Sequence, residues 1–457
     1  MMKLFAENIL LASGWQQNKT LHIDNGLIKA ITDGQDKDAE LAKGAVIPGM
    51  VNCHSHAFQR GFAGFSEQGS ESNDSFWTWR KIMYQFLDNI STEQAEIIAK
   101  QLYIEMLKAG YTRVAEFHYL HHDKCGANHQ QLAAMAKAIF NAAGDTGIGL
   151  TMLPVMYRFS GFGPLEPNDG QKRFINSIEQ FNQLVSDCFV MAKDNDNANV
   201  GIAPHSLRAV DKESLVAAVK HVRSLDEKAP VHVHISEQQK EVQDCLAHYG
   251  KRPVQWLLDN MELDQHWCLI HATHIDEQEV AGIIKTKAIA GICPTTEANL
   301  GDGIFPTTEF MAQGGQVAIG SDSHISVSAI EEIRLLEYAQ RLIKQQRAIL
   351  ANSETRSVGQ NLWQHTAKAG ALSTSSNTGE LAIGKQADLL VLDESKTRLF
   401  ANQNKFILDS MMFASQNNPI TDVMVNGNWC VVGGEHAEQT SSADEFAQVL
   451  KDLGNNR

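Results

Sequence analysis

The sequence has no excess of basic residues. Its 39 lysines and arginines are outnumbered by 54 aspartates and glutamates, which gives a formal net charge of −15. Because there is also no long basic run, we expect neither nucleic acid nor an anionic membrane as a partner. An acidic protein repels anions at long range, so an anionic substrate would have to be held by local arginines.

Long apolar runs are missing, and cysteines are few. No stretch is long enough to span a bilayer. Glu7 and Asn8 interrupt the apolar residues near the N-terminus, which favours a strand over a signal peptide. The seven cysteines are scattered, odd in number and without a C-x-x-C pair, which argues against a disulfide framework or a zinc knuckle. We therefore expect a cytoplasmic protein without a membrane span.

The order of β-like and helical stretches predicts an α/β protein with two domains. Residues 1–46 and 378–440 are rich in short β-like runs and are expected to form one small β-sandwich domain from both chain ends. Between them, apolar β-rich runs alternate with helical stretches over residues 47–377, which predicts a (β/α)8 TIM barrel. Residues 441–457 are expected to form a helical tail.

Local signals support this division. The Asn25-Gly26 pair is typical of a hairpin turn within the first β segment. In the barrel region, Ser91 and Gln94 form a capping-box pattern ahead of helically spaced apolar residues, and Gly110 ends that stretch. Eight apolar runs are candidate barrel strands, beginning with AVIPGMVNCHSH, and polar or charged residues lie at or near their ends.

Histidine and carboxylate side chains recur at the ends of four of these strands. They are His54 and His56 on the first, His232, His234 and Glu237 on the fifth, His271 and His274 on the sixth, and Asp322 on the eighth. A lone H-x-H motif is expected by chance in a chain with 18 histidines. Four strand ends that converge at one mouth of a barrel instead favour a metal site, because three histidines and one aspartate suit a divalent ion with room left for water.

One histidine is preferred within each of two pairs. His234 lies three residues before Glu237, as a ligand and its acid/base partner would, whereas His232 lies one pleat deeper in the strand. His271 ends its strand directly, whereas His274 is expected to begin the following loop.

The H-x-H, H-x-x-E, histidine and aspartate motifs, together with GKQADLLVLD, resemble the amidohydrolase superfamily and, more narrowly, its mononuclear deaminase branch. Longer stretches, including DSFWTWR, AEFHYLHHD, APHSLRAV and CPTTEANLGDGIFP, are similar to those members that hydrolyse N-formimidoyl-L-glutamate to N-formyl-L-glutamate and ammonia in histidine degradation. The resemblance covers nearly the whole chain. It implies one Zn²⁺ per chain, a small dicarboxylate substrate and a homodimer.

The resemblance also implies roles for individual residues. It makes His54, His56, His234 and Asp322 the zinc ligands, and Glu237, His271 and Asp322 the catalytic groups. The residues that it places against the substrate are Gln59, Arg80, Tyr119, His205 and Arg208. Arg208 follows the fourth strand and Arg80 is expected in a loop after the first, and each can grip a carboxylate with its guanidinium fork.

Other interpretations remain open at this point. A sister deaminase acting on a purine, pyrimidine or triazine would need aromatic pocket walls, which the FWTWR segment could supply. A non-catalytic metal-binding barrel would lack a ligand or Glu237, and neither is missing. Iron or manganese could occupy the site in place of zinc.

Overall fold

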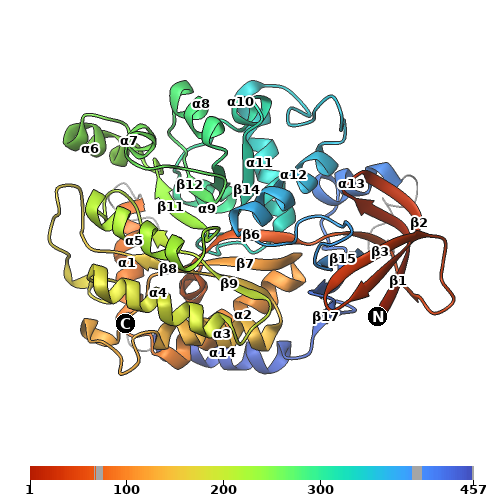
Figure 1. The fold of residues 1–457 in the computed structure, drawn as a ribbon, viewed down its shortest axis with the longest axis horizontal. Coiled ribbons are helices and arrows are strands. Elements are labelled where there is room, and N and C mark those ends of the chain that lie inside the picture. The colour runs from red at the N-terminus through yellow and green to blue at the C-terminus, as the bar shows by residue number, and fades with distance from the viewer. Residues whose placement is uncertain (66, 68–75, 394–403, 455–457) are drawn as a thin grey trace.

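The computed structural model describes residues 1–65, 67, 76–393 and 404–454. Its larger part is a ring of parallel strands surrounded by helices, and a smaller sheet lies at one side (Figure 1). The first two residues of the DSFWTWR stretch and the last three of the expected tail lie outside the described residues, as do residues 394–403 of the second β segment.

The parallel strands form a closed barrel in two hydrogen-bonded arcs. One arc has the order β10-β8-β7-β6 with β9 beside β8, and the other has the order β11-β12-β13-β14. Isolated parallel bridges join the arcs, between Ile202 and Val231 on one side and between Ser55 and Asp322 on the other. When β9 and β10 are counted as one interrupted strand, each arc has four strands and the barrel has eight. This confirms the predicted (β/α)8 barrel. The strands are β6 (Met50–Ser55), β7 (Tyr111–His118), β8 (Gly149–Met156), β9 (Ala198–Val200), β10 (Ala203–Pro204), β11 (Val231–Ile235), β12 (Trp267–His271), β13 (Ile289–Ile292) and β14 (Gln316–Ile319).

Helices cover the outside of the ring, so the strands are buried on both faces. Every residue of β7 and β8 is buried, as expected for parallel strands between a barrel interior and a helical layer. The helices are α1 (Phe76–Leu87), α2 (Thr92–Lys108), α3 (Ala134–Thr146), α4 (Ile178–Ala192), α5 (Lys212–Leu225), α6 (Gln239–Tyr249), α7 (Pro253–Asn260), α8 (Glu277–Thr286), α9 (Pro294–Leu300), α10 (Thr307–Ala312), α11 (Ala329–Lys344), α12 (Val358–Ser373), α13 (Ile407–Phe413) and α14 (Gln439–Gly454), with short 3-10 turns at Ala57–Phe62, Lys124–Gly126, Asp169–Gln171 and Asn404–Phe406. In α2 the predicted capping box is present, because Ser91 and Gln94 each bond the other's backbone N–H.

Strands from both chain ends form the smaller sheet, in the order β18-β17-β16-β15-β5-β1-β2-β3 with β4 beside β1. The antiparallel pairing of β15 with β5 joins the two ends, which confirms the predicted β domain of mixed origin. The predicted hairpin turn connects β2 and β3, and its Asn25 and Gly26 have φ angles of 49° and 74°. The strands are β1 (Met2–Leu11), β2 (Gly14–Asp24), β3 (Leu27–Asp33), β4 (Glu40–Leu41), β5 (Ala45–Pro48), β15 (Leu389–Leu392), β16 (Ile420–Val425), β17 (Asn428–Val432) and β18 (Glu435–His436).

The first expected barrel strand, AVIPGMVNCHSH, is two strands. Its first part is β5 of the small sheet and its second part is β6 of the barrel, with Gly49 between them. A side chain at position 49 would clash with Thr112, since an added Cβ would lie 2.3 Å from the threonine methyl group. The chain therefore passes from one domain to the other at a glycine that allows this close approach.

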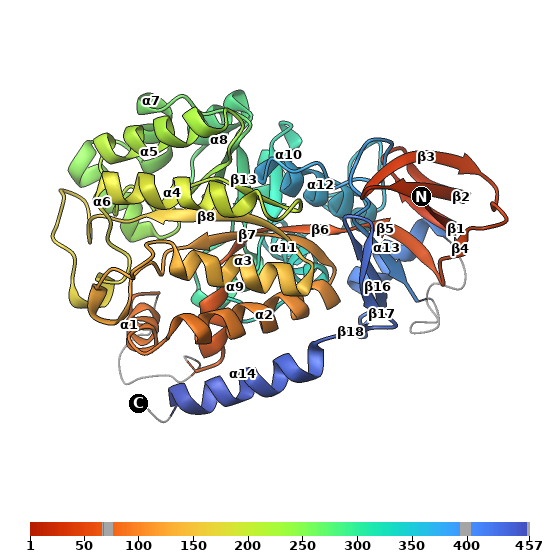
Figure 2. The same ribbon diagram turned by 60° about the horizontal axis from the view of Figure 1, so that its bottom comes forward.

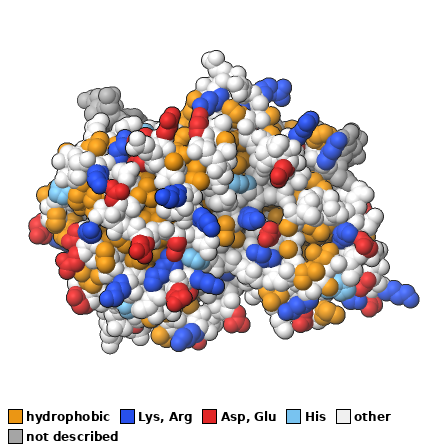
Figure 3. All heavy atoms as spheres, turned by 45° about the horizontal axis from the view of Figure 1, so that its top comes forward, with side chains coloured by type: hydrophobic (Ala, Val, Ile, Leu, Met, Phe, Trp, Pro, Cys, Tyr) orange, Lys and Arg blue, Asp and Glu red, His pale blue; other side chains and the backbone are white. Residues whose placement is uncertain are grey.

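The last helix, α14, returns along the outside of the barrel beside α2 (Figure 2). Its Val449 and Leu453 are buried in an apolar cluster with residues of α1 and α2. Within the described residues, no helix is both long and apolar enough to cross a bilayer. On the face shown in Figure 3, basic and acidic side chains are interspersed.

Candidate active site

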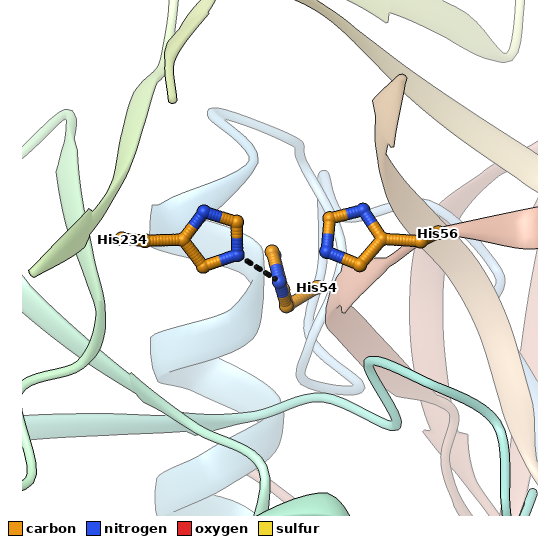
Figure 4. A group of neighbouring side chains, drawn as sticks. All are labelled: His54, His56 and His234. Atoms are coloured by element: carbon orange, nitrogen blue, oxygen red, sulfur yellow. Dashed lines mark hydrogen bonds between the residues drawn. The ribbon is translucent and has the colours of Figure 1, made fainter. Parts of the chain in front are cut away.

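Three imidazoles meet at the mouth of the barrel where the strands end. His54 belongs to β6, His56 follows it directly, and His234 belongs to β11. The rings of His56 and His234 lie on either side of His54, with nitrogens directed inward (Figure 4). The Nε2 atoms of His234 and His54 are 3.0 Å apart, and one nitrogen from each ring lies within 4.8 Å of the others. Imidazole nitrogens gathered in this way can share one cation.

Asp322 adds a carboxylate to this cluster. Its Oδ1 lies 3.4 Å from Nε2 of His54 and 3.3 Å from Nε2 of His56. The backbone holds it there, because the Asp322 N–H donates to the His54 carbonyl and the His56 N–H donates to the Asp322 carbonyl. The structure therefore brings together the four residues that were predicted as metal ligands.

The protonation of these side chains suits a metal. Nδ1 of His56 lies 2.9 Å from the Phe117 carbonyl oxygen and Nδ1 of His234 lies 3.0 Å from that of His205. A carbonyl can only accept, so Nδ1 carries the proton in both rings and the bare Nε2 faces the centre. Burial, reinforced by the charge of His56, lowers the pKa of His54 to about 3.

His54 and Asp322 complete this donor set. Among the described residues, Nδ1 of the buried His54 has no hydrogen-bond partner. Burial acts to raise the pKa of Asp322, but its hydrogen bond to His54 and the nearby histidines bring it below the usual range. Three neutral imidazoles and a carboxylate thus fit a divalent cation.

His271 and Glu237 lie beside this centre. The His271 ring stacks on the His234 ring with centroids 5.6 Å apart, and its Nε2 is 3.7 Å from Oδ2 of Asp322. Burial acts to lower the pKa of His271, but the carboxylates of Glu237, Glu297 and Asp322 raise it to about 10. Burial raises the pKa of Glu237, against the opposing charges of His271 and Arg208. A raised pKa brings a glutamate closer to the range in which it can give and take a proton near neutral pH.

Several residues at or next to the site have a strained backbone conformation. His271, Asp322 and Ser236, which precedes Glu237, have φ angles of 67°, 48° and 52°. Such left-handed conformations cost non-glycine residues about 1–3 kcal/mol each and persist where the surroundings enforce them. Their concentration at this mouth of the barrel indicates that side-chain placement here has taken precedence over backbone preference.

A cavity with about 530 Å³ of space unfilled by protein atoms opens over the cluster. Its walls include all five residues predicted to hold a substrate, namely Gln59, Arg80, Tyr119, His205 and Arg208. Nε2 of Gln59 donates to the Tyr119 hydroxyl at 3.0 Å. A concave site lined by aromatic rings and a few polar groups is typical of a pocket for a small molecule.

The two arginines differ in their surroundings. Arg208 is largely buried, with its guanidinium 3.7 Å from Glu237 and 4.0 Å from Glu241. Arg80 was expected in a loop, but it lies in α1, where its helix turns it toward the cavity. Its guanidinium bonds the hydroxyl of Tyr84 and, at 3.0 Å, that of Tyr157.

Other cavity residues were not among those predicted individually to bind a substrate. They are Trp79, Met83, Tyr84, Tyr157, Phe174 and Leu300. Tyr157 directly follows β8, so its place at the end of a strand was an available signal. Trp79 is part of the FWTWR pattern at the start of α1, which was expected to supply aromatic walls only for a nucleobase or triazine, and Tyr84 follows in the same helix. Nothing local marks Phe174 or Leu300.

The two histidines that were set aside point elsewhere. Nε2 of His232 bonds the Ser373 carbonyl at 2.7 Å, and Nε2 of His274 bonds the Asp302 carbonyl at 2.8 Å. Neither lines the cavity.

Comparisons with known proteins show the family and the fold of the chain. The model of the amidohydrolase family matches residues 45–430. A formimidoylglutamate deiminase from Pseudomonas aeruginosa is 47% identical over 99% of this chain and 100% of its own length. A crystal structure of an amidohydrolase from Brucella melitensis superposes with a TM-score of 0.94, at 44% identity, 99% coverage of this chain and 100% of that chain. An adenosine deaminase from Xanthomonas campestris with bound zinc shares the fold at a TM-score of 0.81 and 19% identity, covering 99% of this chain and 98% of its own.

Proposed function

The chain belongs to the amidohydrolase family of enzymes, and from that premise we propose that it hydrolyses N-formimidoyl-L-glutamate to N-formyl-L-glutamate and ammonia. The observation that carries the proposal is a single cavity in which a three-histidine, one-aspartate cluster lies beside two arginines. The first feature suits hydrolysis of a carbon–nitrogen bond, and the second suits a substrate with two carboxylates.

We assign one divalent ion, Zn²⁺, to His54, His56, His234 and Asp322. His56 and His234 present bare Nε2 atoms, Nε2 of His54 lies beside them with Oδ1 of Asp322, and Zn²⁺ prefers such a nitrogen-rich set with one carboxylate. When bound, this ion lowers the pKa of a water molecule to about 7 and so supplies a nucleophile at neutral pH.

Two side chains around the cluster carry out the proton transfers. The water oxygen bonds to the formimidoyl carbon, and the carboxylate of Asp322 accepts a water proton. Glu237 donates a proton to the terminal nitrogen. Asp322 then passes its proton to the same nitrogen, and the hydroxyl of the tetrahedral species returns a proton to Glu237. The carbon–nitrogen bond breaks with its electron pair on nitrogen, so that ammonia leaves and both side chains regain their starting protonation. His271, with Nε2 on the Asp322 side, orients the water and stabilises negative charge on the oxygen in the tetrahedral species.

The other wall of the cavity holds the rest of the substrate. Arg208 and Arg80 bind the carboxylates, and Gln59, Tyr119 and His205 offer neutral polar groups between them and the centre. Glu237 lies between Arg208 and His271, so the leaving nitrogen meets an acid within the same small cavity that holds the carboxylates.

A nucleobase deaminase is the second candidate, because aromatic rings line part of the cavity. Trp79, Tyr84, Tyr157 and Phe174 could cover a flat base. Two arginines in the same cavity favour an anionic ligand over a neutral base, since each guanidinium can bind a carboxylate. The relative that is 47% identical also carries the deiminase name, whereas the adenosine deaminase is 19% identical.

Ammonia release separates the two candidates. Metal-loaded protein should release ammonia from N-formimidoyl-L-glutamate and leave adenosine, guanine and cytosine unchanged. Faster turnover of any of these bases would overturn the proposed substrate. A cytoplasmic homodimer is part of the same proposal, and sedimentation velocity at micromolar concentration would test the dimer.

A further inference from the structure

Glu297 is a buried carboxylate at the site that the mechanism above does not use. It belongs to the short helix α9, and its Oε1 lies 3.2 Å from Nδ1 of His271. The same oxygen accepts the backbone N–H of Cys293 at 2.9 Å. Glu297 is absent from the described residues that line the cavity, so it reaches the chemistry only through His271.

The helix that carries Glu297 is hydrogen-bonded to the segment after β14 that carries Asp322. Oγ1 of Thr296 donates to the Ser321 carbonyl at 3.2 Å and bonds Oγ of Ser323 at 3.0 Å, and these two serines flank Asp322. On the other side, the N–H of Thr295 donates to Oε2 of the buried Glu332 at 2.9 Å. One short helix therefore contacts His271 through Glu297 and the Asp322 loop through Thr296.

We propose that Glu297 is the positioning residue of His271: it accepts the Nδ1–H and so fixes the ring orientation in which Nε2 faces Asp322. A carboxylate can only accept at this distance, so it selects the ring form with a proton on Nδ1. Without this acceptor, rotation of the ring by half a turn about its Cβ–Cγ bond would exchange Nδ1 for a carbon and move Nε2 away from the reacting atoms. This inference rests on the proposed role of His271 in the deiminase reaction.

A double-mutant cycle tests the proposal. Glu297→Ala should lower kcat about 10- to 100-fold, the usual cost of removing the partner that orients a functional histidine, while KM and metal content change little. Because Glu297 acts through His271, adding Glu297→Ala to His271→Ala should cause no further loss. Glu297→Gln should restore much of the activity, since its amide oxygen can accept both hydrogen bonds that Oε1 accepts now.

Glu332→Gln is the matched control, because Glu332 is a buried carboxylate that holds the same helix and its bonds to Thr295 do not involve His271. Any loss caused by Glu332→Gln should multiply with that of His271→Ala. Equal, multiplying losses for both glutamates would show that Glu297 only stabilises α9 and would overturn the proposal.

Proton NMR of histidine-labelled, metal-loaded protein provides a test that needs no substrate. A downfield Nδ1–H signal, assigned by its loss in His271→Ala, should be lost or shifted in Glu297→Ala and persist in Glu332→Gln. An unchanged signal in Glu297→Ala would contradict the proposal. Failure to release ammonia from N-formimidoyl-L-glutamate with the wild-type NMR behaviour intact would instead refute the proposed function alone.

Discussion

Replacing Arg208 by methionine should have two separable effects. Arg208 lies 3.7 Å from Glu237 and 4.0 Å from Glu241, and both carboxylates are buried. Without the guanidinium, their charged forms lose a nearby cation, so the pKa of Glu237, already raised by burial, should rise further. This first effect acts on the enzyme and should slow every substrate alike.

The second effect depends on the substrate. A hydrogen bond to a charged group contributes about 1.5–3 kcal/mol, which corresponds to about 10- to 150-fold in kcat/KM. This loss should appear for N-formimidoyl-L-glutamate and vanish for the one analogue that lacks the carboxylate bound by Arg208. An analogue that lacks the other carboxylate should still show it.

The assay is ammonia release by wild type and Arg208→Met with the dicarboxylate and both monocarboxylate analogues, together with metal analysis. Arg158→Met is the control, because Arg158 contacts Ser214 and Asp211 and does not line the cavity, so its loss should affect all three substrates equally. If neither Arg208→Met nor Arg80→Met shows coupling to either carboxylate, the dicarboxylate assignment is wrong and a nucleobase substrate becomes the better account.

Four further changes test other parts of the account. Glu237→Gln should keep its metal but lose at least about 10²-fold in kcat, the scale of a general acid, and normal turnover would remove Glu237 from the mechanism. His234→Ala should lose the bound ion in elemental analysis, and unchanged metal content would refute its assignment as a ligand. Tyr157→Phe removes the hydroxyl that accepts from Arg80, so KM should rise about 5- to 20-fold with less effect on kcat, and an effect on kcat alone would contradict this reasoning. Glu116→Ala leaves the buried donors of Ala57 and Tyr103 unpaired and removes one of the two partners of the Ser55 hydroxyl, so urea denaturation should show a loss of about 3 kcal/mol or more, and a loss below about 1 kcal/mol would contradict it.

The metal cluster could be predicted from sequence because its parts are local. His54, His56, His234 and Asp322 each lie at or just beyond the end of an apolar strand, and a (β/α)8 barrel brings such ends to one mouth. The choice of His271 over His274 depended on the same rule, since only the first is the last residue of β12. Their convergence is thus a consequence of topology, whereas their catalytic roles stay predictions.

Groups that act through other side chains could not be predicted in this way. Glu297 is a single acidic residue in a seven-residue helix, and its meaning depends on a histidine that is 26 residues away in the chain. In the sequence, Glu116 is one polar residue within a strand. Only the structure shows that it accepts hydrogen bonds from three neighbours. Arg80 was expected in a loop because it follows the first strand, where the loops of a barrel form its site, whereas the structure places it in α1.

The boundary between the domains was hidden for a related reason. The apolar run from Ala45 to Ser55 is continuous in composition, but Gly49 divides it between two sheets. The apolar pattern of the sequence predicts that such residues are buried. It does not predict which strand they pair with.

The central claim is that one ion, held by three histidines and Asp322, supports hydrolysis of N-formimidoyl-L-glutamate. The most direct test is to remove bound metal with a chelator, add back Zn²⁺ in measured portions and follow ammonia release. The account predicts that activity is absent without metal, rises in proportion to added Zn²⁺ and reaches its plateau at about one equivalent per chain. A plateau at two equivalents, activity that persists in metal-free protein, or no ammonia at any loading would contradict it.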